Sequence, residues 1–243
     1  MSDVFAFKHF SIHQEHAAMK VGTDSDLLGV LAAGGEHILD IGTGTGILSL
    51  MLAQRFPTSK ITAIDIDDDA IIDAKRNFDE SPYSDRIELI HTSFQDYLNE
   101  FKSTSENPPF DCIICNPPYF DKSLESPDKG RSRARHTSSL PFNILIEGAF
   151  SLLADGGVFS VCIPPEVLSP FSSECIIEGF WPKETYYIKS VPEKPVKRII
   201  LVYKKGRVLD PGKHTFCMRN SDHSLSNWYK ELMHEFHFPQ NGH

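Results

Sequence analysis

The stretch "LDIGTGTGILSL", residues 39–50, indicates the fold of this chain. Gly42, Gly44 and Gly46 follow a short apolar segment that carries Asp40, and an apolar segment with helical spacing comes next. Glycines at a strand-to-helix turn let the backbone approach a ligand closely, and they leave helix amides free to receive it. The stretch therefore predicts a ligand-binding turn between a strand and a helix of an α/β protein.

Strand and helix patterns alternate on both sides of this turn. We expect strands at 37–41, 60–66, 86–91, 110–115, 156–164, 183–191 and 197–205, the last two forming a hairpin at one edge. We expect helices at 24–33, with Thr23 or Asp24 as the N-cap, and at 47–56, 67–78, 94–101, 140–153 and 224–236. This order predicts a Rossmann-like α/β fold, a seven-stranded and mostly parallel sheet with helices on both faces. No linker interrupts the pattern, so we expect residues 1–243 to form a single domain.

The composition excludes some classes of protein. The 24 basic and 33 acidic side chains give a net charge of −9, so the molecule as a whole does not attract nucleic acid. Basic residues nevertheless gather at 129–136 and 194–207, which allows a local basic surface. No apolar run approaches the roughly 20 residues that span a bilayer, and the N-terminus does not resemble a secretory signal. We expect a cytoplasmic protein without a membrane partner.

Two of the five cysteines, Cys112 and Cys115, have the spacing of a redox or zinc motif. They lie inside an expected strand, however, where residues three apart point to opposite faces and cannot share a metal ion. We expect them to be buried apolar side chains, and we expect no metal.

Asp65, at the end of the second expected strand, is the natural partner of the glycine turn. A carboxylate in this position can accept hydrogen bonds from both hydroxyls of a ribose, so the pair indicates a cofactor that contains a nucleoside. The spacing is G-x-G-x-G after an acidic residue, whereas NAD sites favour G-x-G-x-x-G. In this it resembles the Rossmann-type S-adenosyl-L-methionine methyltransferases, which implies that cofactor and a cofactor-binding role for Ile66 beside Asp65.

The same resemblance places the cofactor's adenine at the end of the third strand, in "HTSFQD" (91–96). Many relatives carry an Asp for the adenine amine near the position of Phe94. Three groups remain as alternatives here: Ser93, the amide of Phe94 and Asp96. The ring of Phe94 could also pack on the adenine.

The stretch "NPPY" follows the fourth expected strand as Asn116, Pro117, Pro118 and Tyr119. An adenine amine is a poor nucleophile because its lone pair is delocalised into the ring. The side-chain carbonyl of Asn116 and the backbone carbonyl of Pro117, which Pro118 holds rigid, can accept the two amine hydrogens and direct the lone pair at a methyl donor. Tyr119 can stack on the base. The stretch resembles the (D/N)-P-P-(Y/F/W) motif of enzymes that methylate planar amino groups, which also places Asn116 beside the cofactor.

In methyltransferases of this order, a segment before the first strand closes over the methionine end of the cofactor. Residues 1–24 have that position. The resemblance implies that the Thr23 hydroxyl lies near the cofactor carboxylate, with Lys20 close by. A plain helix cap is the other interpretation of the same residues.

Several stretches together resemble one bacterial family, the tRNA1(Val) adenine-37 N6-methyltransferases. They are "AMKVGTDSDLLG" (18–29), "LDIGTGTG" (39–46), "NPPYF" (116–120) and "RARHTSSL" (133–140). The resemblance implies methyl transfer to the 6-amino group of adenosine 37, with the anticodon arm of valine tRNA as partner. The basic positions between Lys122 and His136 then either hold RNA phosphates or form a solvated loop. We expect a monomer.

Other functions remain as alternatives. The same motif serves enzymes that methylate guanine or adenine in ribosomal RNA, or a glutamine of a release factor, although many of these carry an additional domain. A non-catalytic protein that binds a cofactor or RNA is the alternative from another class, as is a dehydrogenase. Titration with S-adenosylmethionine against NAD would separate the last two.

Overall fold

The chain folds around an eight-stranded sheet with the strand order β10-β8-β9-β7-β6-β3-β4-β5. The computed structural model describes residues 3–17, 20–103, 108–117 and 140–238. The strands of the sheet are β3 (His37–Ile41), β4 (Lys60–Asp65), β5 (Ile87–His91), β6 (Phe110–Cys115), β7 (Leu153–Ile163), β8 (Phe180–Lys189), β9 (Val196–Lys205) and β10 (Gly212–Cys217). β3 to β7 pair in parallel, β9 runs antiparallel to both β7 and β8, and β10 is parallel to β8.

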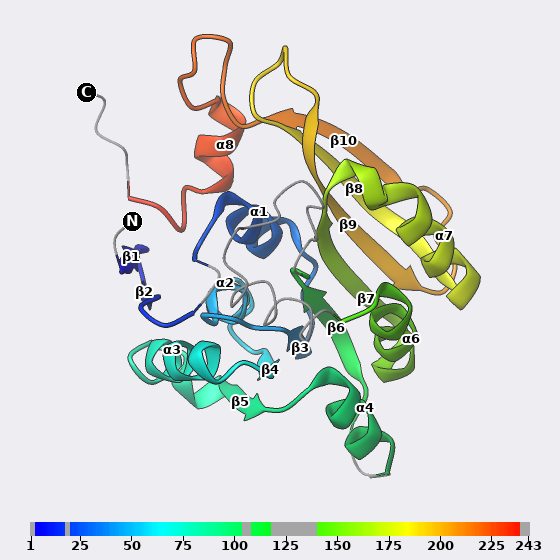
Figure 1. Cartoon of the computed structure of the whole chain (residues 1–243). Coiled ribbons are helices and arrows are strands. Elements are labelled where there is room, and N and C mark those ends of the chain that lie inside the picture. Colours follow the sequence, from blue (N-terminus) through cyan, green and yellow to red (C-terminus); the bar gives the residue numbers. More distant parts are fainter. Residues whose placement is uncertain (1–2, 18–19, 104–107, 118–139, 239–243) are drawn as a thin grey trace, which may run out of the picture.

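Helices cover both faces of the sheet, as Figure 1 shows. One face carries α1 (Thr23–Leu31), α2 (Ile47–Arg55) and α3 (Asp68–Asp79), and the other carries α4 (Phe94–Ser103), α6 (Phe142–Leu152) and α7 (Leu168–Glu178). The buried apolar side chains accordingly form two clusters. Cys112 belongs to the first cluster and Cys115 to the second, which confirms that they point to opposite faces. The predicted α/β architecture is confirmed.

The sheet has one strand more than the seven expected. β10 pairs with β8 along its whole length, yet its sequence "GKHTFC" is mostly polar. At the sheet edge Lys213 and Thr215 of β10 are exposed, so the strand lacks the apolar run by which buried strands are recognised. The expected hairpin of the sixth and seventh strands is confirmed as β8 and β9, but β10 and not the hairpin forms this edge of the sheet. The N-cap of α1 is Gly22, not Thr23 or Asp24, and no side chain caps this helix.

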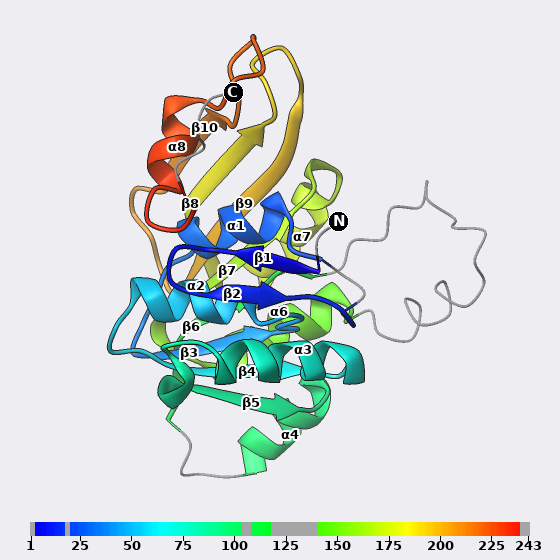
Figure 2. The same cartoon turned by 90° about the vertical axis from the view of Figure 1, so that its left-hand side faces the viewer.

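A second, two-stranded sheet lies near the N-terminus. β1 (Val4–Ala6) and β2 (Ser11–His13) pair antiparallel, and Figure 2 shows them beside α2 and α3. The segment after α8 (Asn227–Leu232) meets this sheet, because the amide of Lys8 donates to the carbonyl of Phe236 (2.8 Å). The first and last described parts of the chain are therefore held together.

Part of the expected site lies outside the described residues. Pro118, Tyr119 and the basic positions from Lys122 to His136 belong to the range 118–139, which the structure does not describe. Within the described residues, no helix is long and apolar enough to cross a membrane.

Candidate active site

Strand register brings the three central parts of the expected site to one edge of the sheet. Ile41 of β3 lies opposite Cys115 of β6 and opposite Ile64 of β4. The residues that follow, Gly42, Asn116 and Asp65, are therefore neighbours on adjacent strand ends, which are about 4.8 Å apart in a sheet. A group held at the glycine turn thus lies within reach of both Asn116 and Asp65.

All three glycines of the turn have positive φ: 69° at Gly42, 57° at Gly44 and 83° at Gly46. A Cβ at Gly42 or Gly44 would meet no described atom within 4 Å, so the backbone is open to a ligand there. A Cβ at Gly46 would lie 2.3 Å from the ring of Phe78, so this glycine is required for packing against α3. Any side chain at the first two positions would stand in front of the turn.

The first three amides of the turn are bonded to the end of β4. Gly42 and Thr43 donate to the carbonyl of Ile64 (2.9 and 3.0 Å), and Gly44 donates to Asp65 Oδ2 (2.8 Å). The turn therefore offers close backbone approach, while its first three amides bind it to the end of β4.

Asp40 is fully buried beneath the turn. Its Oδ2 accepts hydrogen bonds from the hydroxyls of Thr43 and Ser49, both at 2.7 Å. Its Oδ1 is buried and has no hydrogen-bond partner among the described residues. Burial raises the pKa of the Asp40 carboxyl to about 6, against the lowering effect of the two hydroxyls. A buried acceptor without a partner fits a cationic ligand group at this point.

Asp65 closes β4 with both carboxylate oxygens on backbone amides. Oδ2 accepts from Gly44 and Oδ1 from Asp67 (3.0 Å). Burial raises the pKa of Asp65, while the amides of Asp67 and Gly44 oppose that shift. A carboxylate can accept about four hydrogen bonds, so Asp65 keeps capacity for ribose hydroxyls. Ile66 follows it with 53% of its surface exposed, an apolar side chain open to a flat ring.

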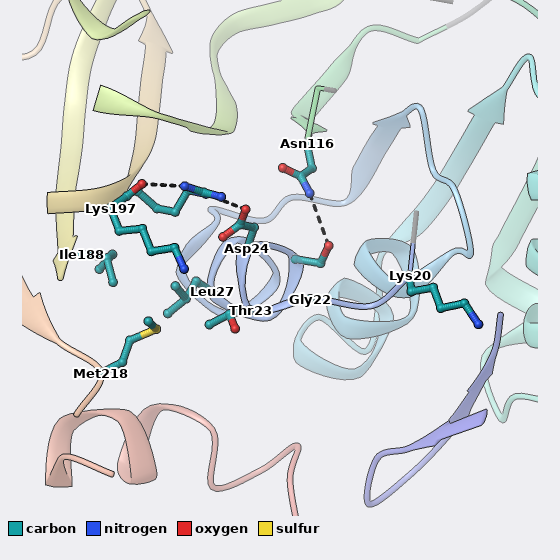
Figure 3. A pocket seen from close by; sticks show the side chains of 11 residues that line it. Lys20, Gly22, Thr23, Asp24, Leu27, Asn116, Ile188, Lys197 and Met218 are labelled. Atoms are coloured by element: carbon teal, nitrogen blue, oxygen red, sulfur yellow. Dashed lines mark hydrogen bonds and ion pairs between the residues drawn. The ribbon is translucent and has the colours of Figure 1, made fainter. Parts of the chain in front are cut away.

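Asn116 is oriented by α1. Its Nδ2 donates to the hydroxyl of Ser25 (3.3 Å), and Figure 3 shows its carbonyl oxygen on the side away from that contact. Pro117 follows it and is buried. The sequence interpretation missed Ser25, which lies in the first turn of α1 and fixes which end of the Asn116 amide faces the site.

The segment after β5 settles part of the question about the adenine. The Ser93 hydroxyl donates to Asp96 Oδ2 (2.6 Å) and accepts from the amide of Asp96 (3.0 Å), so the two side chains hold each other at the start of α4. The Phe94 side chain is only 5% exposed, and its ring lies against Gly148 of α6. This ring belongs to the buried core cluster on this face of the sheet; Ser93, the Phe94 amide and Asp96 remain the alternatives.

Near α1, Thr23 and Lys20 both line the cavity beside Asn116, but they have different surroundings. Thr23 is exposed at the first residue of the helix and lines the cavity beside Asn116. The ammonium group of Lys20 forms an ion pair with Asp3 (2.9 Å), and Figure 3 shows this side chain directed away from Asn116. The structure therefore supports an open position for Thr23 but gives Lys20 a partner other than the expected one.

Two polar residues of α3 hold the N-terminal segment, and the sequence interpretation missed both. Asp73 accepts from the amides of His16 (3.0 Å) and Ala17 (2.8 Å). Asn77 accepts from the amide of His13 (2.7 Å) and donates to the carbonyls of His13 and Thr45, both at 2.8 Å. Asn77 therefore joins the N-terminal segment to the glycine turn.

The sequence of α3 contains a pattern from which the role of Asp73 and Asn77 could have been predicted. Asp73 and Asn77 share a helix face with the buried Ala70 and Ala74, whereas Ile72 is 52% exposed. Polar side chains on the buried face of an amphipathic helix need partners, which here come from the N-terminal segment.

A cavity of about 260 Å³ begins at Asn116 and extends over α1 towards the β8–β9 hairpin. Its walls include Thr23, Asp24 and Leu27 of α1 and Lys197 of β9. The sequence pattern did not indicate this cavity, because its walls come from four distant parts of the chain.

Comparison with known proteins gives the family. The model of the methyltransferase small domain matches residues 16–162. A tRNA1(Val) (adenine(37)-N6)-methyltransferase from Bacteroides thetaiotaomicron is 37% identical over 239 residues, covering 96% of this chain and 96% of that protein. The protein of the same name from Phocaeicola vulgatus is 44% identical over 202 residues, covering 82% of this chain and 83% of its own.

Among solved structures, a protein from Agrobacterium tumefaciens described as a predicted O-methyltransferase has a TM-score of 0.68. It is 20% identical and covers 90% of this chain and 100% of its own, a likeness that shows the shared fold alone. The full-length relatives, the matching domain model and the aligned strand ends together confirm the resemblance noted in the sequence: this chain belongs to the tRNA1(Val) (adenine(37)-N6)-methyltransferase family.

Proposed function

We propose that this protein transfers the methyl group of S-adenosyl-L-methionine to the 6-amino group of adenosine 37 in valine tRNA. The observation that carries the proposal is the placement of Asn116 directly beside the glycine turn, at the end of the adjacent strand. The names of the full-length relatives supply the identity of the RNA and the nucleotide.

The described residues fit the cofactor. Asp65 is placed for the ribose hydroxyls, and the open backbone at Gly42 and Gly44 leaves room for the methionine part. The unpartnered oxygen of Asp40 suits the cofactor's ammonium group. Ile66 offers an apolar surface to the adenine. When bound, the cofactor supplies an electrophilic methyl group on a sulfonium.

Asn116 and Pro117 supply the acceptors for the reacting amine. Because Ser25 holds the amide end of Asn116, the carbonyl oxygen of Asn116 faces the other side, where we assign it as one acceptor. The backbone carbonyl of Pro117 is the second. Two acceptors at fixed angles pull the amine nitrogen towards tetrahedral geometry and aim its lone pair, and such positioning contributes roughly 7–11 kcal/mol. The proton leaves after transfer, so no strongly basic residue is required.

The N-terminal segment helps to complete the cofactor site. Asp73 and Asn77 hold residues 13–17 against α3, and Gln14 Oε1 accepts from the amide of Val21 (2.7 Å), which brings the chain back to α1. This path leads to Thr23, whose hydroxyl we assign to the carboxylate of the cofactor. Pro118 and Tyr119 keep their assignments as the rigid support and the stacking ring of the same motif.

The test is direct methylation of a defined RNA. The purified protein is incubated with labelled S-adenosylmethionine and a valine tRNA transcript, and the nucleosides are identified by mass spectrometry. We expect N6-methyladenosine at position 37 and no label in a transcript that carries guanosine there. Label only in ribosomal RNA or in a glutamine-containing protein would identify one of the alternative substrates and refute the proposed one.

A further inference from the structure

The cavity beside Asn116 contains a cation that the proposed chemistry does not use. Lys197 of β9 lines the cavity, and Figure 3 shows its side chain extending towards α1. Asp24, an acid of the same wall, is ion-paired with Arg198 (2.6 Å). Within the described parts of the chain, no carboxylate forms an ion pair with Lys197.

Strand direction places Lys197 beyond the carboxyl ends of the parallel strands, where Asn116 also lies. β9 runs antiparallel to β7, with Ile199 opposite Ile163, the last residue of β7, so Lys197 lies beyond the carboxyl end of that strand. Lys204 lies opposite Val158, in the middle of β7 and close to the other end of β9. Seven residues of strand, about 23 Å, separate the two lysines. The basic stretch noted at 194–207 is thus divided between the two ends of β9, and only its first part reaches the cavity.

The floor of the cavity is apolar. Leu27 of α1, Ile188 of β8 and Met218, which follows β10, form this part of the wall. Met218 is half-buried and its sulfur faces the cavity from the side opposite Asn116. A flexible, polarizable thioether makes favourable contacts with aromatic rings. An apolar floor beside a lysine that has no ion-pair partner among the described residues suits a nucleobase with an adjoining phosphate.

The position of this floor excludes the target adenine as its occupant. β9 and β8 are the second and third strands from β6 in the sheet, which corresponds to about 10 and 14 Å at the spacing of neighbouring strands. The target amine must be within hydrogen-bond distance of Asn116. A base whose amine is bonded to Asn116 cannot also contact Ile188 and Met218. The far end of the cavity can therefore hold a second group.

We propose that this cavity binds the nucleotide adjacent to the target adenosine, with its base on Leu27, Ile188 and Met218 and its phosphate on Lys197. The inference rests on the proposed function, because it assumes an RNA substrate. Target bases in single-stranded loops have neighbours that are easily unstacked, and such bases are recognised on apolar and aromatic surfaces. The whole cavity, including its end at Asn116, has a volume of about 260 Å³, which is too small for an RNA stem.

The neighbouring charges support an RNA partner. Lys189, Lys194 and Arg219 lie at the same edge, at the β8–β9 turn and after β10. Glu193 and Asp222 are the acids of these turns, and each accepts from a serine hydroxyl, Ser221 and Ser224, and keeps its negative charge. Three cations against two acids leave a net charge of +1 at these turns. Cations around a single-stranded binding site hold the phosphate backbone.

The first test compares Lys197→Ala with Lys204→Ala, which removes the same charge from the opposite end of the same strand. Both variants are assayed for tRNA methylation from about 50 to 200 mM salt. For Lys197→Ala we expect the KM for tRNA to rise about tenfold, with the KM for S-adenosylmethionine unchanged, and Lys197→Arg to restore it. The slope of log affinity against log salt should fall by about 0.7, the value for one phosphate of a single strand. Lys204→Ala should behave as the unmodified protein.

The second test removes the base instead of the cation. A valine tRNA with an abasic nucleotide on one side of adenosine 37, then on the other, is compared with intact tRNA. We expect one abasic position to raise the KM about tenfold, as for a lost stacked base. Met218→Gln, which keeps the side-chain length, should raise the KM for intact tRNA but not for that abasic tRNA.

The outcomes separate this inference from the proposed function. If the unmodified protein methylates valine tRNA while Lys197→Ala and Lys204→Ala have equal KM values and salt slopes, the nucleotide pocket is refuted and the proposed function stands. If both abasic tRNAs had the same KM as intact tRNA, the nucleotide pocket would also be refuted and the proposed function would stand. If the unmodified protein methylates no tRNA, the proposed function fails and the pocket assignment fails with it. Unchanged melting temperatures of the variants show that a raised KM does not reflect unfolding.

Discussion

Asn77→Asp tests the connection between the N-terminal segment and the glycine turn with almost no change of shape. Asn77 is 1% exposed, and its amide nitrogen donates to the carbonyls of His13 and Thr45, both at 2.8 Å. In the variant an oxygen replaces this nitrogen and faces two carbonyl oxygens. The remaining oxygen can still accept from the amide of His13, so the change removes two donated hydrogen bonds and keeps the third.

The expected cost depends on pH. A buried acceptor left without its partner costs about 1–3 kcal/mol, so two of them lower the free energy of unfolding by about 4 kcal/mol when the new carboxyl is ionised. The protonated form can donate to one carbonyl, which reduces the loss to about 2 kcal/mol. A difference of about 2 kcal/mol corresponds to a folded-state pKa raised by about 1.5, from about 3.9 to about 5.5.

The direction in which the loss of stability changes with pH follows from the raised pKa of the new carboxyl. Below the unfolded pKa both states are protonated and the loss is smallest. As pH rises above the unfolded pKa, the unfolded state ionises while the folded state stays protonated, so the loss grows between about pH 4 and pH 6 and is constant above the folded pKa. At neutral pH the melting temperature should fall by about 8–16 °C, since each kcal/mol shifts it by about 2–4 °C in a chain of this size.

Urea unfolding followed by tryptophan fluorescence from pH 4 to 8 measures this loss, with Asn99→Asp on the exposed side of α4 as control. The control places the same carboxyl where water solvates it, so its stability should match that of the unmodified protein. Calorimetry should also show weaker binding of S-adenosylmethionine to Asn77→Asp, because Thr45 belongs to the glycine turn. A loss that is independent of pH, or equal to that of Asn99→Asp, would refute the reasoning.

Three further predictions concern the active site directly. Asn116→Ala should lower kcat by roughly 10²–10³, as for a lost transition-state hydrogen bond, with cofactor affinity by calorimetry nearly unchanged; turnover at the original rate would mean that Asn116 does not hold the amine. Asp65→Ala should weaken cofactor binding at least about fivefold, the effect of losing one or more hydrogen bonds to a charged acceptor, and unchanged binding would reject the ribose assignment. Since burial raises the pKa of Asp40 to about 6, its negative charge is present above that pH and lost below it, so cofactor affinity should fall as pH drops through about 6. Asp40→Asn should bind more weakly at pH 7.5 and lose this pH dependence; the same profile in the variant would assign the titration to another group.

The sequence by itself determined the order of the elements and the centre of the site. Glycines after an apolar strand, an acid after the next strand and Asn-Pro-Pro-Tyr after the fourth are local patterns, each readable from a few adjacent residues. The carboxyl ends of parallel strands lie at one edge of a sheet, so these patterns meet wherever such a sheet forms. In the structure Ile41 pairs with Ile64 and with Cys115, so the three patterns do lie on neighbouring strand ends.

Only the tertiary structure decided which side chains support that centre. Asn77 reaches the glycine turn, Ser25 orients Asn116, and Lys20 is paired with Asp3, through contacts that depend on how α1, α3 and the N-terminal strands pack. The separation of Lys197 from Lys204 likewise follows from the antiparallel direction of β9. Hydrogen bonds and charges act over a few ångströms in space, whereas sequence patterns report only neighbours along the chain. Partners that are distant in sequence therefore become visible once the fold brings them within that range.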